Sequence, residues 1–378
     1  MKTQAATVTA PDRAVLVSGA SFAGLATAYW MNKLGYAVTV VEVSKGLKKG
    51  GTPVNIGGDV IDIVKRMGLF EQIQANCLVM EGTEFKNSDD ATEGWFHREP
   101  GNEGSDEDWE IERNTLLDIM FDAVKDDVEF VFSNSIEGLE ETADDVRVSF
   151  RDGTRRSFSL IFGCDGNHSL VRKIQFGDES GYTHFLRQYF SITIINKLLI
   201  KENTTQMYNV PGKAVMLNAY NNKTDIVLCF SSASEIPYDY RDEKRQREII
   251  AQQFAGQDWR IPELLEEVEH SRTFYFDKVC QIKMPSWTKG RVALVGDAAY
   301  CASPAAGMGG SLAIIGAAAL AGAFEKHGGN FELAFQHYNQ TFRPYIEKVQ
   351  ADAARNLDVL VPQTEEAIRE RNTQPKPW

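Results

Sequence analysis

The sequence predicts an α/β fold (α+β overall) with a Rossmann-like part of three-layer ββα character, a mostly antiparallel second sheet and a C-terminal helical segment. Two observations predict the first part: apolar strands at residues 13–18 and 291–295 each run into a glycine-containing turn and then a helix. A third predicts the second sheet, because residues 174–280 alternate apolar with polar residues and are rich in β-branched ones.

Length, composition and charge limit the class of protein. The chain has 378 residues, which predicts one large domain or two closely associated ones. Its net charge of −13 argues against nucleic acid as a partner. No apolar run reaches the length of a membrane span and residues 1–12 lack the order of a signal peptide, so we expect a cytoplasmic monomer without a membrane partner. The cysteines are widely spaced, which predicts reduced thiols and no metal site: Cys77, Cys164, Cys229, Cys280 and Cys301.

The first glycine turn opens a βαβ unit. A strand at 13–18 precedes the turn, a helix over 25–34 follows it, and a strand at 37–41 ends at Glu42. Small residues in such a turn let a pyrophosphate approach the helix N-terminus, and an acid about 20 residues later binds a ribose hydroxyl. We therefore predict dinucleotide binding, although the pattern is GxSxxG rather than GxGxxG. The predicted contacts are Gly19, Ser21, Phe22, Ala23, Gly24 and Glu42.

A loop and several short elements are expected next. Residues 44–58 are rich in glycine and lysine and predict a loop, and helices are expected over 58–67 and 69–74. Residues 77–109 predict an excursion into a second layer or an exposed hairpin. Arg113 precedes a helix expected over 115–124 with Asn114 as its N-cap, and its plain interpretation is a surface residue of the first turn.

A second strand–turn–helix unit lies at the middle of the chain. Strands are expected at 128–132, 135–141 and 145–150, a hairpin turn at 151–154, and a buried strand at 157–164. That strand ends at the run Asp165-Gly166-Asn167-His168-Ser169-Leu170-Val171-Arg172. Its plain interpretation is a βα turn capped by Asp and Ser, with Arg172 in solvent.

The middle region predicts strands at 189–200, 206–210, 214–220, 225–231 and 274–283, with helices over 242–254 and 262–270. Its aromatic residues are more often core than ligand pocket, and Trp287 is expected to pack. The aromatic residues considered are Phe185, Tyr189, Phe190, Tyr220 and Phe230.

A glycine-dense loop follows the strand at 291–295. The run is Gly296-Asp297-Ala298-Ala299-Tyr300-Cys301-Ala302-Ser303-Pro304-Ala305-Ala306-Gly307-Met308-Gly309-Gly310-Ser311, and a helix is expected over 312–324. An acid at a strand end can accept hydrogen bonds from sugar hydroxyls, and the helix N-terminus offers unpaired N–H groups. The plain alternative is an ordinary βα turn with a capping Asp. A further helix is expected over 330–356, kinked or divided at Pro344, and continuing over 357–370.

Together these segments resemble a known family. Residues 296–311 resemble the GDAAH-x4-PxxGxGxN segment of the FAD-dependent aromatic hydroxylases, the single-component flavoprotein monooxygenases related to p-hydroxybenzoate hydroxylase. Residues 165–172 resemble the family's DGxxSxxR motif, and Arg113-x-x-Leu116 resembles its RxxL segment. Residues 283–301, Ser311-Leu-Ala and the long C-terminal helix look most like the tetracycline destructase branch.

The resemblance implies site residues. Asp297 would contact the flavin ribitol, Arg113 the ribityl and pyrophosphate region, and Asp165 the pyrophosphate. The loop beside the isoalloxazine ring would comprise Pro304, Gly307, Met308 and Gly309. Three positions depart from the family pattern: Tyr300, Met308 and Ser311, where His, Gln and Asn are usual.

The resemblance also implies an activity. The protein would be an FAD-dependent monooxygenase that uses NAD(P)H and O2 to hydroxylate an aromatic or polycyclic phenol or enol through a flavin C4a-hydroperoxide, with tetracycline-like antibiotics among the candidate substrates. The sequence shows no clear catalytic base and no second nucleotide-binding motif after residue 60. Two alternatives stay open: a flavin-dependent dehydrogenase or reductase, and a non-catalytic FAD-fold ligand-binding protein.

These patterns predict a division of the chain into domains. Residues 1–12 would form a flexible tail, and residues 329–378 a C-terminal helical segment. The FAD-binding domain would be discontinuous and comprise 13–75, 110–174 and 281–328. The substrate-binding domain would comprise 76–109 and 175–280.

Overall fold

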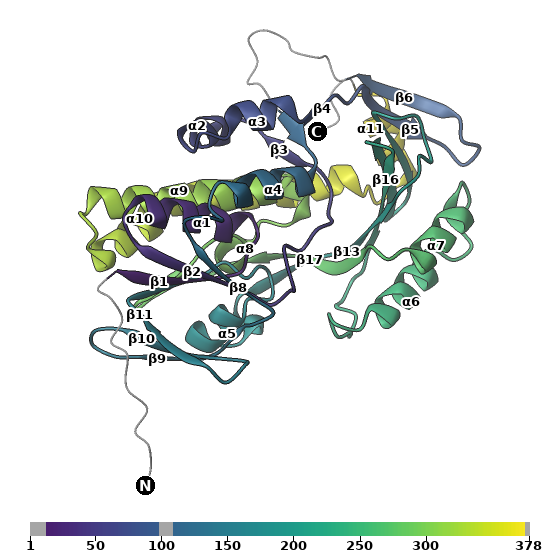
Figure 1. Cartoon of the computed structure of the whole chain (residues 1–378). Coiled ribbons are helices and arrows are strands. Elements are labelled where there is room, and N and C mark those ends of the chain that lie inside the picture. Colours follow the sequence, from purple (N-terminus) through teal and green to yellow (C-terminus); the bar gives the residue numbers. More distant parts are fainter. Residues whose placement is uncertain (1–12, 98–108, 375–378) are drawn as a thin grey trace.

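A computed structural model describes residues 13–97 and 109–374 (Figure 1). The predicted tail at 1–12, the acidic part of the predicted excursion at 98–108 and the last four residues lie outside the described residues. The described part contains two larger sheets and two small three-stranded ones. Its mixed α/β architecture confirms the predicted fold class.

A six-stranded sheet forms the centre of the Rossmann-like part. All neighbours in it are parallel except the short edge pair, and Val15 lies opposite Val38 on one side and Leu160 on the other. Every residue of the first strand is buried, as expected for a strand covered on both faces. In spatial order the strands are β18 (Thr288–Lys289), β19 (Val292–Leu294), β12 (Leu160–Gly163), β1 (Ala14–Ser18), β2 (Ala37–Glu42) and β8 (Glu129–Phe132).

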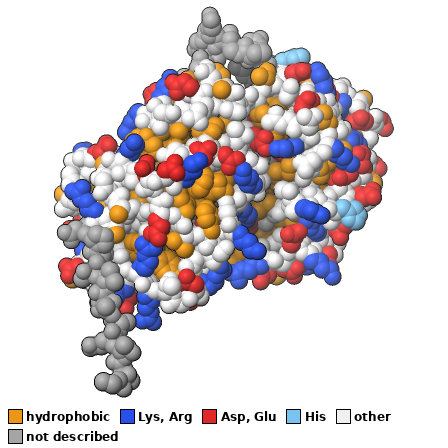
Figure 2. Space-filling view, in the orientation of Figure 1, with side chains coloured by type: hydrophobic (Ala, Val, Ile, Leu, Met, Phe, Trp, Pro, Cys, Tyr) orange, Lys and Arg blue, Asp and Glu red, His pale blue; other side chains and the backbone are white. Residues whose placement is uncertain are grey.

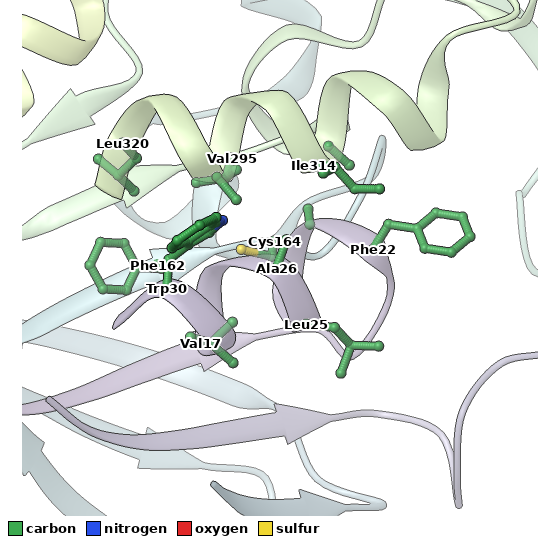
Figure 3. Close-up of a cluster of buried hydrophobic side chains, with 14 of the residues drawn as sticks. Val17, Phe22, Leu25, Ala26, Trp30, Phe162, Cys164, Val295, Ile314 and Leu320 are labelled. Atoms are coloured by element: carbon green, nitrogen blue, oxygen red, sulfur yellow. The ribbon is translucent and has the colours of Figure 1, made fainter. Parts of the chain in front are cut away.

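Helices cover one face of this sheet and a small sheet covers the other, which gives the three-layer ββα arrangement (Figure 1). The helices are α1 (Phe22–Lys33), α4 (Arg113–Asp122), α9 (Gly309–Lys326) and α10 (Phe331–Leu360). The small sheet contains β9 (Ile136–Glu141), β10 (Val146–Phe150) and β11 (Arg155–Phe158), with α5 (Leu170–Phe176) beside it. Figure 3 shows Leu25, Trp30 and Ile314 between α1, α9 and the strands, where close packing of apolar side chains stabilises the layers.

The second large sheet has seven strands. Apart from the parallel β14–β5 pair, its neighbours are antiparallel. In spatial order they are β17 (Phe274–Ile282), β13 (Thr183–Ile195), β16 (Lys223–Ser231), β15 (Lys213–Tyr220), β14 (Thr204–Val210), β5 (Gly82–Lys86) and β6 (Thr92–His97). The predicted excursion at 77–109 is thus partly an edge hairpin of this sheet. Short turns connect the strands as predicted at 211–212 and 221–222.

The two faces of the seven-stranded sheet differ in burial. Helices α6 (Glu243–Phe254) and α7 (Ile261–His270) cover one face, where Tyr189, Leu217 and Phe276 belong to a closed apolar core. Side chains alternate between the two faces along each strand, so Ile192, Met216 and Asn218 lie on the other face. There they are only half-buried. We call this second face the open face of the sheet.

Short elements complete the fold. Strands β3 (Val54–Ile56), β7 (Trp109–Ile111) and β4 (Cys77–Leu78) form the other three-stranded sheet, next to α2 (Asp59–Arg66) and α3 (Phe70–Ala75). The remaining elements are η1 (Glu179–Gly181), α8 (Asp297–Tyr300), η2 (Pro304–Ala306) and α11 (Glu365–Asn372).

Several predictions of elements were wrong, and the strand expected at 189–200 is β13, which begins at Thr183 and ends at Ile195. The loop at 44–58 contains β3, and the strand at 157–164 is two strands in different sheets, divided at Ser159, whose N–H donates to Ala14 O. Helix α4 begins at Arg113 with Glu112 as its N-cap, because the Asn114 side chain accepts from Gly50 N instead of capping. The C-terminal helix passes through Pro344 without a break but ends at Leu360, and Thr364 caps a separate helix.

Candidate active site

The first glycine turn is closely packed and needs its glycines. Gly19 has φ +102°, and a Cβ there would lie 2.5 Å from the carbonyl oxygen of Cys164. A Cβ on Gly24 would lie 1.8 Å from the Gly19 carbonyl oxygen. Chain and helix therefore approach each other at van der Waals distance, directly beside the end of β12. Ser21 is the N-cap of α1, but its hydroxyl makes no capping hydrogen bond and instead accepts one from Arg113.

Glu42 links this turn to the following loop. Its carboxylate accepts hydrogen bonds from Ala20 N and from Ser44 N, both at 2.9 Å. A carboxylate has about four acceptor positions, so it retains capacity for a ligand. Its place at the carboxyl end of β2, next to the turn, is the one predicted from the spacing.

Arg113 joins three segments. Its guanidinium donates to Ser21 Oγ at 3.0 Å, to Gly50 O at 3.0 Å and to Lys48 O at 3.2 Å, and it lies 5.0 Å from the centre of the Phe22 ring. Burial lowers its pKa, while the nearby Asp297 and Tyr275 oppose that shift. The interpretation of Arg113 as a solvated surface residue is wrong.

Asp165 and Arg172 organise the second unit. Asp165 accepts from Leu170 N at 2.8 Å and Val171 N at 3.0 Å, and also from the Ser169 hydroxyl, so it caps α5. Burial raises the pKa of Asp165, and these hydrogen bonds oppose the rise. Arg172 is 1% exposed and donates to Ala298 O at 2.9 Å, so its predicted alternative position in solvent is wrong.

The third loop meets the first turn. A Cβ on Gly310 would lie 2.6 Å from Val54 Cγ1 and 3.3 Å from the Phe22 ring, and Ser311 Oγ donates to Asn55 O at 2.5 Å. Gly307 has φ +62°, which favours glycine. Burial raises the pKa of Asp297 to about 6, against the opposing effects of Cys301, Arg113 and Arg172.

Two buried amides hold the start of this loop. Gln350 of α10 donates to Ile282 O at 2.9 Å and to Cys301 O at 3.1 Å. Gln281 of β17 donates to Gln350 O at 2.6 Å and to Ala302 O at 3.3 Å. The C-terminal helix and the second sheet therefore both fix the segment that follows Asp297.

Tyr300, one of the departures from the family pattern, lies in the core. It is 1% exposed and its hydroxyl shares a 3.0 Å hydrogen bond with that of Tyr338. Its ring packs at 4.8 Å from that of Trp287, which confirms the packing role predicted for Trp287. Of the aromatic residues considered as core, Tyr189, Tyr220 and Phe230 are fully buried.

A cavity of about 1300 Å³ runs along the first turn. Five predicted site residues line it: Gly19, Ser21, Glu42, Arg113 and Asp165. Figure 2 shows a hollow in this face of the molecule with Lys and Arg side chains along its edge. The other eight predicted residues are not in its lining: Phe22, Ala23, Gly24, Asp297, Pro304, Gly307, Met308 and Gly309.

Sequence reasoning missed several lining residues. Six basic side chains line the cavity beside five acidic ones, Glu42, Asp165, Asp178, Glu179 and Glu235, and cations in the lining suit an anionic diphosphate. Of the basic lining residues, Arg113 was predicted and Lys48 lies in the predicted lysine-rich loop, while its neighbour Lys49 pairs with Asp118 instead. The basic lining residues are Lys48, Arg113, Arg151, Lys173, Arg241 and Lys278.

The described residues contain no group of three or more His, Cys, Asp or Glu placed to hold a metal ion. Within 13–97 and 109–374, no helix is both long and apolar enough to cross a membrane.

Comparison with known proteins decides the family. Residues 12–348 match the model of the FAD binding domain family. The chain belongs to the FAD-dependent monooxygenases. A flavin-dependent monooxygenase from Legionella longbeachae is 33% identical over 337 residues, 88% of this chain and 86% of that protein. An uncharacterized Mycobacterium tuberculosis protein, Rv1260, is 35% identical over 349 residues, 91% of this chain and 94% of that protein.

Solved structures agree with this membership. The tetracycline destructase Tet(51) superposes on the monooxygenase with a TM-score of 0.84 at 33% identity, covering 95% of this chain and 94% of that one. Klebsiella pneumoniae HpxO in complex with FAD and uric acid has a TM-score of 0.75 at 20% identity, covering 95% and 93%, and shows the shared fold. The resemblance stated from the sequence is confirmed.

The site of the monooxygenase fits FAD. The cavity has a volume of about 1300 Å³, the carboxylate of Glu42 stands at the end of β2, and the turn at Gly19 has no room for a side chain beside the end of β12. A dinucleotide needs these three features: space, an acceptor for ribose hydroxyls, and close approach to backbone N–H groups.

Proposed function

We propose that the protein hydroxylates a polycyclic phenol or enol, of the tetracycline type, with NAD(P)H and O2 as co-substrates. The observation that carries the proposal is the position of the open face of the seven-stranded sheet. Phe190 and Val279 of that face pack with Ala305 of the loop after Asp297. A ligand on the open face would therefore lie next to the loop assigned to the flavin ring.

We assign the FAD contacts residue by residue. Glu42 would bind the adenosine ribose, and the turn from Gly19 to Gly24 with Arg113 would bind the pyrophosphate. Asp165 would support the pyrophosphate region through the loop that it caps, because its own oxygens are already engaged. Asp297 would bind the ribityl hydroxyls. The segment that carries Pro304, Gly307, Met308 and Gly309 would lie along the isoalloxazine ring.

Bound FAD would make two-electron reduction by NAD(P)H and activation of O2 available at this position. The chain would contribute electrostatics and shielding. The N-terminus of α9, which follows Gly307, carries a partial positive charge and would stabilise negative charge on the ring. Gln281 and Gln350 would keep the loop in position during this change.

The open face suits a flat, partly polar ligand. Ile192 and Met216 are half-buried apolar residues on it, while Thr205 and Asn218 add polar groups that hydrogen-bond to each other at 2.9 Å. Flat ligands of this kind bind to apolar surfaces with a few placed polar groups. The 33% identity to a tetracycline destructase supports a polycyclic substrate.

We also propose the domain division predicted above. Residues 13–75, 110–174 and 281–328 would bind FAD, residues 76–109 and 175–280 the substrate, and residues 329–378 would close over both.

The proposal is tested with labelled dioxygen. The holoenzyme is incubated with NADPH, a tetracycline and labelled O2, and the products are analysed by mass spectrometry. We expect a product that carries one labelled oxygen atom. A product without label, or NADPH oxidation that yields only peroxide with every polycyclic phenol or enol tried, would contradict it. Turnover without oxygen, with an artificial electron acceptor, would support the dehydrogenase alternative.

A further inference from the structure

Tyr275 lies on the open face of the sheet. Its side chain is 40% exposed and its ring lies 5.6 Å from that of Phe190, which packs with Ala305. It is opposite Ile192 in the register of β13 and β17. Residues opposite each other in an antiparallel pair share a face, so Tyr275 lies on the open face. This is the side of the sheet next to the loop that carries Ala305, Gly307 and Met308, which we call the flavin loop.

The hydroxyl of Tyr275 has a fixed direction. It donates to Asp277 Oδ2 at 3.0 Å. A phenol has one proton and two acceptor lone pairs, and a carboxylate can only accept. The single proton of Tyr275 is therefore committed to Asp277, and the oxygen presents lone pairs alone to its other neighbours.

Asp277 is held as a carboxylate. It is 2% exposed and accepts four further hydrogen bonds: from Tyr238 Oη at 2.9 Å, Lys278 N at 2.8 Å, His168 Nε2 at 3.1 Å and Asn167 Nδ2 at 3.3 Å. Burial opposes ionisation of Asp277, but His168, Tyr238 and Tyr275 outweigh it and lower its pKa. Burial also opposes the charged form of His168, yet Asp277 and Glu179 raise the pKa of His168 to about 9. An ionised Asp277 beside a protonated His168 keeps the Tyr275 proton pointing inward.

We propose that Tyr275 determines substrate specificity by accepting a hydrogen bond from a hydroxyl group of the substrate. The inference rests on the proposed function and narrows it: the ring that faces the flavin loop must carry a phenolic or enolic O–H. An ether or carbonyl oxygen at the same position has no proton to donate, so it would face the lone pairs of the Tyr275 oxygen without a hydrogen bond. Such a site rejects the analogue that lacks the donor, because a polar group is left unpaired.

Two variants separate this role from simple packing. Tyr275→Phe removes the acceptor and keeps the ring. Asp277→Asn weakens the hold on this proton, because an amide offers one acceptor oxygen where the carboxylate now accepts from Tyr275, Tyr238, Lys278 N, His168 and Asn167. The Tyr275 proton is then free to turn toward the ligand. Tyr182→Phe is the matched control, since it removes a phenol hydroxyl that donates to Phe176 O elsewhere in the protein.

The probes are naphthol and its methyl ether, titrated against the oxidised holoenzyme while the flavin absorption band is followed. In the unaltered protein we expect naphthol to bind about tenfold more tightly than the ether, because a single hydrogen bond contributes about this much to affinity. The preference should disappear in Tyr275→Phe, fall or reverse in Asp277→Asn, and persist in Tyr182→Phe. If Asp277→Asn does not fold, Tyr275→Phe decides alone.

Equal binding of the two probes, or a preference that survives Tyr275→Phe, would overturn the inference while leaving hydroxylation intact. Failure of both probes to bind would also overturn it, since the open face would then not take a hydroxylated ring. Because no turnover is involved, these outcomes are independent of the labelled-oxygen experiment that tests the proposed function.

Discussion

The guanidinium of Arg172 donates a 2.9 Å hydrogen bond to the carbonyl of Ala298, which is 126 residues away in the sequence. It also donates to Asn167 O in its own turn. One buried cation thereby holds together the turn that ends β12 and the turn that carries Asp297. The geometry of the two turns, and with it the space between them, depends on this residue.

Replacing Arg172 by leucine should destabilise the protein strongly. The buried carbonyl of Ala298 and the half-buried carbonyl of Asn167 lose a charged donor. Each such loss costs about 1.5–3 kcal/mol, so the free energy of unfolding should fall by about 3 kcal/mol. Urea denaturation of the flavin-free protein measures it. Arg172→Lys, which keeps a charge, should recover part of the loss, and Arg147→Ala on the exposed small sheet is the control. An Arg172→Leu variant as stable as the parent would show that the connection between the turns is not structural.

Gly316 and Gly322 on α9 should respond in opposite directions to alanine. A Cβ on Gly316 would lie 1.8 Å from Tyr300 Oη, whereas nothing lies within 4 Å of a Cβ on Gly322. Gly322→Ala should stabilise by about 0.5–1 kcal/mol through helix propensity, and Gly316→Ala should destabilise by about 2 kcal/mol or more. Thermal unfolding of both variants compares them. Tyr300→Phe should relieve part of the Gly316→Ala defect, and additive effects of the two changes would contradict the predicted clash.

Asp297→Ala should lose FAD. The carboxylate is the acid between Arg113, Arg172 and the flavin loop, and its removal deletes an acceptor for hydroxyls and leaves two cations less balanced. We expect FAD affinity to fall at least about tenfold, measured by the quenching of flavin fluorescence on titration. Asp152→Ala in the exposed hairpin turn should leave affinity unchanged. Full flavin occupancy in Asp297→Ala would refute the assignment.

The ion pairs of His168 should make stability depend on pH. Burial opposes its charged form, but Asp277 and Glu179 raise its pKa from 6.5 to about 9 in the folded protein. A raised pKa means that the stabilisation is complete below pH 6.5 and is lost as the pH rises through about 9. The stability difference between the parent and His168→Gln should therefore shrink across this interval in urea denaturation. A difference that is constant or grows with pH would contradict it.

Local patterns in the sequence were sufficient for most of the elements and for the first turn. Glycine spacing, the apolar strands and the acid at the end of β2 are properties of neighbouring residues, and the structure brings Gly19, Ser21, Glu42, Arg113 and Asp165 to one cavity. The division of the apolar run at Ser159 was missed because no glycine or proline marks the change of sheet.

Long-range side-chain partners could not be predicted. The contact of Gly310 with Val54 and Phe22 and the pairing of His168 with Asp277 join residues far apart in the sequence, and either member alone has many possible partners. The residue type of Asn114 predicted an N-cap, but its side chain instead accepts a hydrogen bond from the backbone N–H of Gly50, 64 residues earlier. Tertiary packing decides such cases, and no local pattern contains it.

The most direct test of the central claim is anaerobic. The purified yellow protein is mixed with NADPH, with and without a tetracycline, and bleaching of the flavin band is followed with time. We expect bleaching that is faster with the ligand, and an oxygenated product once air is admitted. A flavin that NADPH does not bleach with any polycyclic phenol or enol would contradict a substrate-dependent monooxygenase and favour another electron donor or a binding protein.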